Sequence, residues 1–327
     1  MTPLPPGTGI DRLVWEEHAW RNRLQSLFLL AVMGGFLALL GWLLWGPDGV
    51  WMMLFTGALG IAIGPSVSPQ LVMRLYGARR LSPAEAPELF EVVADLARRA
   101  ELPRPPDLYW VPSRMLNAFA VGTPEQAAVA VTDGLLRQLN LRELTGVLAH
   151  EISHVRNRDL WVMSLADLFS RATSTLSLFG QFLLIVNLPL MMWYGAAINW
   201  FAILLLVFAP TLSALAQLAL SRTREFDADL NAARLTGDPD GLASALAKIE
   251  RAQGSWMERV FLPGRGVPDP SLLRTHPDTA ERIRRLMELK ASLGPSRAPY
   301  PERPVHLDGL GGPVQRPPSW HISGLWH

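Results

Sequence analysis

The feature that most constrains this chain is a run of 50 residues, 172–221, without a single Asp, Glu, Lys or Arg. A helix that crosses a bilayer needs about 20 predominantly apolar residues, so this run is long enough for two such helices. Gly195 and Asn199 interrupt its apolar residues and favour a turn within 194–199. The alternative is a pair of buried helices in a soluble protein, but such helices rarely stay free of charge over this length.

Two further uncharged stretches, residues 24–45 and 50–73, lie nearer the N-terminus. Only Gly46-Pro47-Asp48-Gly49 separates them, and Pro and Gly suit a tight reversal, so together they predict another hairpin of membrane-spanning helices. Pro65 and Pro69 are expected to end its second helix, because a proline inside a helix removes a hydrogen bond. A cleaved signal peptide is the alternative for the first stretch, but its apolar core would be only about 7–15 residues long.

Basic residues flank all four predicted spans on the side away from the two hairpin turns. They are Arg21 and Arg23, then Arg74, Arg79 and Arg80, then Arg156, Arg158 and Arg171, and finally Arg222 and Arg224. Because Lys and Arg accumulate on the cytoplasmic side of a membrane, both chain ends and every segment outside the turns are expected to face the cytoplasm.

The stretches between the predicted spans have the composition of ordinary soluble protein. Apolar spacing predicts a helix over residues 83–99 and strands at 108–111 and 128–131, and Pro239 and Gly241 mark the start of a later helix. The resulting segments are a cytoplasmic N-terminus (1–23), a first membrane hairpin (24–73), a first part of a soluble domain (74–171), a second hairpin (172–221), a second part of that domain (222–292) and a Pro/Gly-rich tail (293–327). We expect a mainly α integral membrane protein with four transmembrane helices, a cytoplasmic α+β domain with a small sheet, and a disordered or loosely docked tail.

Composition excludes several kinds of site and partner. With 30 basic and 29 acidic residues, the net charge of +1 gives no electrostatic footprint for nucleic acid. The chain has no cysteine, so it forms no disulfide, and any metal must be held by His, Asp or Glu.

Residues His150-Glu151-Ile152-Ser153-His154 form an HExxH motif. Apolar residues at steps of three and four around the motif predict that it lies on a helix, where residues four apart share a face and both imidazoles can bind one metal ion. Zinc held by three protein groups keeps an open position and activates water, and Glu151 is placed to act as the general base. The pattern therefore predicts zinc-dependent peptide hydrolysis; the alternatives are two solvated or buried histidines, or a relic that has lost its metal.

A third ligand is needed beside the two histidines, and Glu225 is the candidate. It lies in the first charged cluster after the fourth predicted span, on the same side of the membrane as the HExxH helix. Asp229 follows one helical turn later, where it could orient a ligand histidine. The alternative is that both carboxylates are membrane-flanking charges on a solvated helix face.

These landmarks, over most of the chain, resemble the HtpX-type membrane heat-shock peptidases, gluzincins related to the CAAX-prenyl endopeptidases and the Oma-type mitochondrial proteases. Further matches are Asn117-Ala118-Phe119-Ala120, Thr132-Asp133-Gly134-Leu135 and Thr275-His276-Pro277. The resemblance implies one Zn²⁺ per chain held by His150, His154 and Glu225, with Glu151 as the catalytic base. It also implies quality control of membrane proteins in the bacterial plasma membrane.

The resemblance implies further roles that spacing alone does not. Residues Asn117, Ala118, Phe119 and Ala120 would form an edge strand that binds an extended substrate backbone; without the resemblance they are an ordinary core strand. His276 and Arg282 would lie near the metal, and His276 would stabilise the transition state or occupy the open metal position. A surface helix start is the alternative for His276.

Three functions can be weighed against these sequence features. The first is a zinc endopeptidase that cuts membrane proteins or unfolded polypeptides. The second is a catalytically silent membrane chaperone or adaptor, which would have no need of Glu151. The third is a small transporter or channel, which would need ionisable residues inside its spans, and residues 172–221 contain none. The sequence leaves open the substrates, the oligomeric state, the roles of both terminal extensions and the use of another divalent metal.

Overall fold

The structure is a computed structural model, and it describes residues 12–63, 68–193, 200–260, 278–290, 300–307 and 310. The chain forms two compact units. The first unit consists of Met1–Asn22, Val67–Leu160 and Arg224–His327, and the second of Arg23–Ser66 and Trp161–Thr223. The chain therefore changes unit four times, and the charge-free run 172–221 lies wholly within the second unit.

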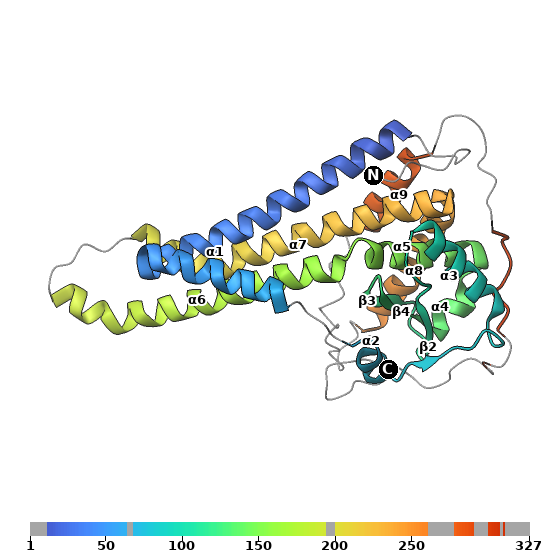
Figure 1. The fold of residues 1–327 in the computed structure, drawn as a ribbon, viewed down its shortest axis with the longest axis horizontal. Helices are drawn as coiled ribbons and strands as arrows, with labels where there is room; N and C mark the ends of the chain where they lie inside the picture. The colour runs from blue at the N-terminus through green and yellow to red at the C-terminus, as the bar shows by residue number, and fades with distance from the viewer. Residues whose placement is uncertain are drawn as a thin grey trace. The chain divides into compact units, whose positions relative to one another are not determined.

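Three of the described helices are long and apolar enough to cross a membrane: α1 (Arg12–Ile63), α6 (Asp159–Trp193) and α7 (Trp200–Thr236). Helix α1 is broken at Gly46, where φ is 63° and ψ is −147°, a conformation that glycine adopts without a steric penalty. The chain reverses at this point (Figure 1), so that Leu40 and Met53, from either side of the break, pack in one apolar cluster. The expected first hairpin is therefore present within α1.

Two details of the predicted spans differ from the structure or fall outside it. The second arm of α1 ends at Ile63, and residues predicted to continue it form a separate helix, α2 (Pro69–Leu75), with Pro69 at its first position. A proline suits that position because its missing N–H has no acceptor there. The turn predicted within 194–199 lies outside the described residues, and α6 and α7 lie on either side of it.

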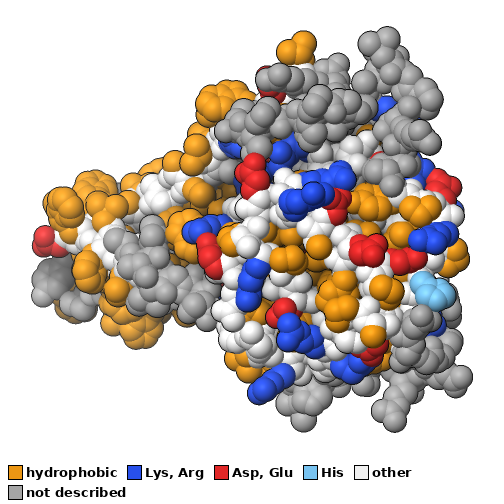
Figure 2. Space-filling model, turned by 45° about the vertical axis from the view of Figure 1, so that its right-hand side comes forward, with side chains coloured by type: hydrophobic (Ala, Val, Ile, Leu, Met, Phe, Trp, Pro, Cys, Tyr) orange, Lys and Arg blue, Asp and Glu red, His pale blue; other side chains and the backbone are white. Residues whose placement is uncertain are grey.

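The helical unit exposes large apolar side chains along its length (Figure 2). Those that are more than half exposed include Phe28, Phe55, Phe182, Ile185, Met192, Phe201 and Phe208. Water disfavours an apolar surface of this extent, whereas lipid tails would cover it without cost. The unit thus has the surface of a membrane protein.

A proline inside α7 is compensated by side chains of α6. Pro210 has no N–H, so the carbonyl of Leu206, four residues earlier, loses its intrahelical donor. The Ser177 hydroxyl donates to that carbonyl, and the Gln181 amide lies 3.5 Å from it and 3.0 Å from the Ser177 hydroxyl. These contacts join the two helices inside the apolar unit, where an unpaired carbonyl would be costly.

The other unit contains a four-stranded mixed sheet in the order β1-β2-β4-β3 (Figure 1). The strands are β1 (Arg79–Arg80), β2 (Asp107–Val111), β3 (Ala118–Thr123) and β4 (Gln126–Thr132). Strands β2 and β4 are parallel, and β3 runs antiparallel to β4, with Ala118 opposite Val131 and Ala120 opposite Val129. The two predicted strands are confirmed, and β3 lies at one edge of the sheet.

Helices supply the rest of the core of this unit. They are α3 (Pro87–Arg99), α4 (Asp133–Gln138), α5 (Leu141–Arg156), α8 (Pro239–Val260) and α9 (Thr279–Glu288), together with the first turns of α1 and the last turns of α7. Fully buried Leu144, Leu148 and Ile152 of α5 belong to the same apolar cluster as Val129 and Val131 of β4. The HExxH helix therefore packs against one face of the sheet, and the predicted helix at 83–99 begins slightly later, at Pro87.

The tail differs from the loosely docked segment that its composition predicts, at least over residues 300–307. The carbonyl of Arg303 accepts a hydrogen bond of 2.8 Å from the backbone N–H of Leu141, the first residue of α5. The Tyr300 hydroxyl donates to Asp95 on α3 at 2.8 Å, and Val305 is buried in the main apolar cluster. Specific hydrogen bonds and burial hold this segment, which composition alone does not reveal.

Candidate metal centre

The helix that carries the HExxH motif is fixed firmly at its N-terminus. Asn140 and Glu143 form a reciprocal capping box, in which each side chain bonds the other's backbone N–H. Glu143 is buried and also accepts hydrogen bonds from Ser244, at 2.6 Å, and Lys248, at 2.7 Å, both on α8. A glycine on α5 permits this close packing, because a Cβ at Gly146 would lie 2.9 Å from the backbone of α8.

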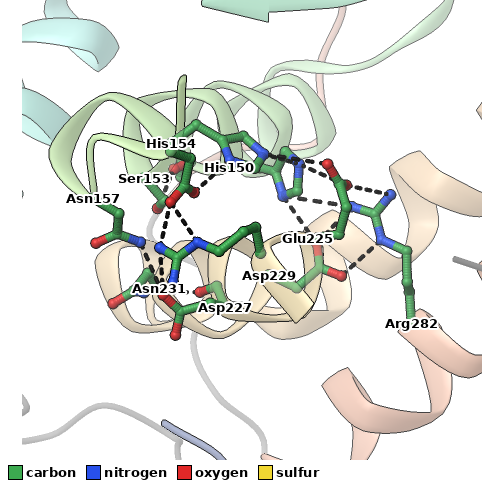
Figure 3. A network of polar contacts seen from close by, with 12 residues as sticks. His150, Ser153, His154, Asn157, Glu225, Asp227, Asp229, Asn231 and Arg282 are labelled. Atoms are coloured by element: carbon green, nitrogen blue, oxygen red, sulfur yellow. Dashed lines mark hydrogen bonds and ion pairs between the residues drawn. The ribbon is translucent and has the colours of Figure 1, made fainter. Parts of the chain in front are cut away.

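Three predicted ligands converge on one point between α5 and α7 (Figure 3). The Nε2 atoms of His150 and His154 lie 3.1 Å apart, and each lies 3.5 Å from a carboxylate oxygen of Glu225. Tetrahedral zinc with ligands at 2.0–2.1 Å would separate them by about 3.3 Å. The donor set of two imidazoles and one carboxylate thus has the spacing and the chemistry that a zinc ion requires.

Two buried aspartates contact the imidazoles of His150 and His154. Asp229 lies 3.0 Å from Nδ1 of His150, and Asp159 lies 2.7 Å from Nδ1 of His154. A proton on Nδ1 would be donated to the carboxylate and would leave a lone pair on Nε2. At 3.1 Å the two Nε2 atoms need a positive centre between them, a proton or a metal ion, because two facing lone pairs repel.

Each of these aspartates is in turn held by a buried arginine. Arg282 of α9 donates to both oxygens of Asp229, at 2.6 and 2.7 Å, and its third nitrogen lies 3.4 Å from Glu225. Arg224 of α7 donates to Asp159 at 2.6 Å. The arginines balance carboxylates that would otherwise be buried without a counter-charge.

Electrostatics at His150 favour positive charge on the ring. Burial alone would lower the pKa of His150, but hydrogen bonds to Asp229 and Glu225 outweigh burial and raise it to about 10. The same carboxylates would favour a divalent cation bound at Nε2, which carries positive charge as a proton does.

Glu151 is partly exposed and follows His150 on α5. Burial lowers the pKa of the Arg282 guanidinium, but the negative charges of Asp229, Glu225 and Glu151 raise it. The Glu151 carboxylate therefore lies close enough to the centre to interact electrostatically with the same arginine as Glu225. Its position beside the histidines, outside the ligand triad, is the one the motif predicts for a base.

The remaining predicted residues have different outcomes. Asn117 precedes β3, and Ala118, Phe119 and Ala120 lie on it; among the described residues, no strand pairs with its outer edge. Arg282 lies beside the centre, with Nη2 3.4 Å from Nδ1 of His150, whereas His276 lies outside the described residues.

Asp159 and Arg224 are the residues of this polar network that the sequence analysis did not single out. Asp159 is the first acidic residue after the HExxH motif and begins α6, and Arg224 immediately precedes Glu225. A position just after the motif and a position just before Glu225 are the only sequence signals for these two residues. In the sequence, however, both look like ordinary membrane-flanking charges.

An HExxH helix with a glutamate ligand from a second helix defines a metallopeptidase centre of the gluzincin type. The model of peptidase family M48 matches residues 83–290, which is more than half of the chain. The chain belongs to peptidase family M48, and it is an HtpX-type metallopeptidase.

Similar proteins come from archaea and bacteria. A protease HtpX homologue of Pyrococcus furiosus is 39% identical over 81% of this chain and 95% of its own length. Those of Thermococcus kodakarensis and Paraburkholderia phytofirmans are each 37% identical, over 83% and 82% of this chain and 97% of their own length. A crystal structure of Ste24p from S. mikatae matches 82% of this chain and 66% of that chain, at 20% identity and a TM-score of 0.43.

Proposed function

We propose that this metallopeptidase is a zinc-dependent endopeptidase that cleaves membrane proteins, misfolded ones in particular, as quality control in the bacterial plasma membrane. The observation that carries the proposal is the convergence of His150, His154 and Glu225, each at zinc-ligand spacing, with Glu151 next to His150 on the same helix. The resemblance to heat-shock peptidases supports the choice of substrate.

The residues of the centre divide the chemistry among them. A bound zinc ion would lower the pKa of a water molecule to about 7 and polarise the scissile carbonyl. Glu151 would accept the proton of the attacking water and deliver it to the departing amine nitrogen, so one carboxylate serves as base and then as acid. Asp229 would keep the proton of His150 on Nδ1 throughout, so that Nε2 stays available as a ligand.

The sheet edge gives a place for the substrate backbone. Strand β3 belongs to the sheet that packs on α5, and its Ala118 and Ala120 contact the apolar cluster shared with that helix. An extended polypeptide could pair with the outer edge of β3, where backbone hydrogen bonds bind any sequence. This mode of binding suits an enzyme that cuts many unfolded substrates.

The topology we propose has four membrane crossings, with both arms of α1 counted separately. The second arm, residues 47–63, is about 25 Å long at 1.5 Å per residue, slightly less than the bilayer core. Both termini and the metal centre would lie in the cytoplasm, because basic residues flank the spans on that side. A reporter fused after Asp48 should therefore be external and one fused after Arg80 cytoplasmic; the reverse pattern would refute this orientation.

The deciding experiment compares zinc content and cleavage of a membrane protein by the wild type and by Glu151→Gln, both purified in detergent. We expect about one zinc per chain in both and cleavage only by the wild type. Glu250→Gln on the exposed side of α8 is the matched control and should cleave normally. Zinc in both proteins without cleavage by either would favour the silent chaperone or adaptor instead.

A further inference from the structure

Asp159 occupies an unusual position for a charged residue. Asp159 is the first residue of α6, one of the long apolar helices, yet only 3% of the residue is exposed. One carboxylate oxygen lies 2.7 Å from Nδ1 of His154, and the other accepts from Nε of Arg224 at 2.6 Å. Nη2 of Arg224 also contacts that second oxygen.

With both oxygens engaged, this carboxylate has only one orientation available to it. Arg224 donates two N–H groups to one oxygen, which turns the other oxygen toward the imidazole. Arg224 lies 3.3 Å from Asp227, and Asp227 accepts a 3.1 Å hydrogen bond from Asn157 in the connection between α5 and α6. The chain at the start of α6 is therefore bonded to α7 at two residues, Asn157 and Asp159.

We propose that Asp159 is a positioning residue of the metal centre, which fixes the tautomer and ring orientation of His154, and that Arg224 holds it in place. The inference rests on the proposed metal site. It makes the support of the two histidines symmetrical: Asp229 and Arg282 orient His150, whereas Asp159 and Arg224 orient His154. Because Arg224 adjoins Glu225, one short segment of α7 would both supply a ligand and position another.

The test uses the full-length protein in detergent with Asp159→Asn, which keeps the shape of the side chain and removes its charge. Zinc affinity is measured by competition with a chelator, and the coordination geometry by the visible spectrum of bound Co²⁺. Loss of an outer carboxylate typically weakens metal binding by about 10–100-fold, and we expect a loss in this range with a changed Co²⁺ spectrum. Arg224→Gln should produce a smaller loss of the same kind, and it serves as the second variant if Asp159→Asn fails to fold.

Asp238→Asn is the matched control. Asp238 is also a buried aspartate held by two donors of one arginine, Arg142, at 2.6 and 2.8 Å, but it contacts no histidine in the part of the chain that the structure describes. The Asp238→Asn variant should have a lower unfolding temperature without metal, but the same zinc affinity and Co²⁺ spectrum as the wild type. A purely structural Asp159 would behave in the same way as this control.

The outcomes separate this inference from the proposed function. If the wild type binds zinc and Asp159→Asn binds it equally well with the same Co²⁺ spectrum, the positioning role is wrong and the metal site stands. If the wild type binds no zinc or Co²⁺, the metal site fails and the positioning role with it. Weaker zinc binding by Asp159→Asn but not by Asp238→Asn supports the role.

Discussion

Replacing Arg282 with methionine should destabilise the peptidase unit more than any surface substitution on the same helix. Only 5% of Arg282 is exposed, and it donates two hydrogen bonds to Asp229, itself 4% exposed. Each hydrogen bond to a charged group contributes about 1.5–3 kcal/mol, so two give about 3–6 kcal/mol. Breaking a buried ion pair by removing one partner costs about 3–5 kcal/mol, which agrees.

The assay is thermal unfolding of full-length protein in detergent, in the Glu151→Gln background so that proteolysis does not obscure the transition. For a domain of this size, about 3–5 kcal/mol corresponds to a decrease of roughly 6–20 °C in Tm. The decrease should be larger with a chelator than with zinc, because a bound cation would offset the carboxylates of Asp229 and Glu225 that Arg282 otherwise balances.

Arg284→Met is the control, since Arg284 lies on the same helix and forms only exposed ion pairs with Glu281 and Glu288. Exposed pairs contribute little to stability, so its Tm should stay close to that of the parent. The reasoning would be refuted if Arg282→Met unfolded within 2 °C of Arg284→Met in chelator (a tolerance of roughly 0.5–1 kcal/mol).

Three further predictions concern the supports around the centre. Asn140→Ala removes half of the capping box and should cost about 1 kcal/mol in chemical denaturation; an unchanged midpoint would contradict the role of the cap. Gly146→Val inserts a side chain where a Cβ alone would lie 2.9 Å from the backbone of Leu242, and it should lower the free energy of unfolding by about 1–3 kcal/mol and reduce zinc affinity. Wild-type values of both would show that α8 moves aside freely. Trp15 is only 5% exposed, and its indole N–H donates to the carbonyl of Leu230. Trp15→Ala should therefore lower the free energy of unfolding by about 3–5 kcal/mol and speed proteolysis of the N-terminus. Protease resistance equal to that of the wild type would argue against docking of this segment.

The sequence alone determined the features that depend on local spacing. Charge-free stretches marked α1, α6 and α7 because a bilayer requires long apolar segments, and the HExxH motif placed two imidazoles on one helical face because α-helices repeat every 3.6 residues. Glu225 and Asp229, chosen from charge and position, both lie within 3.5 Å of His150.

Only the tertiary structure decided the contacts between segments far apart in the chain. Asp159 and Arg224, 65 positions apart, meet because α5, α6 and α7 pack together, and neither residue carries a local pattern that distinguishes it from a membrane-flanking charge. Residues 300–307 likewise dock on α3 and α5 although their composition favours a loose tail. The physical reason is the same in both cases: spacing along one helix fixes which residues share a face, whereas the partner of a buried charge is fixed only when separate elements pack against each other.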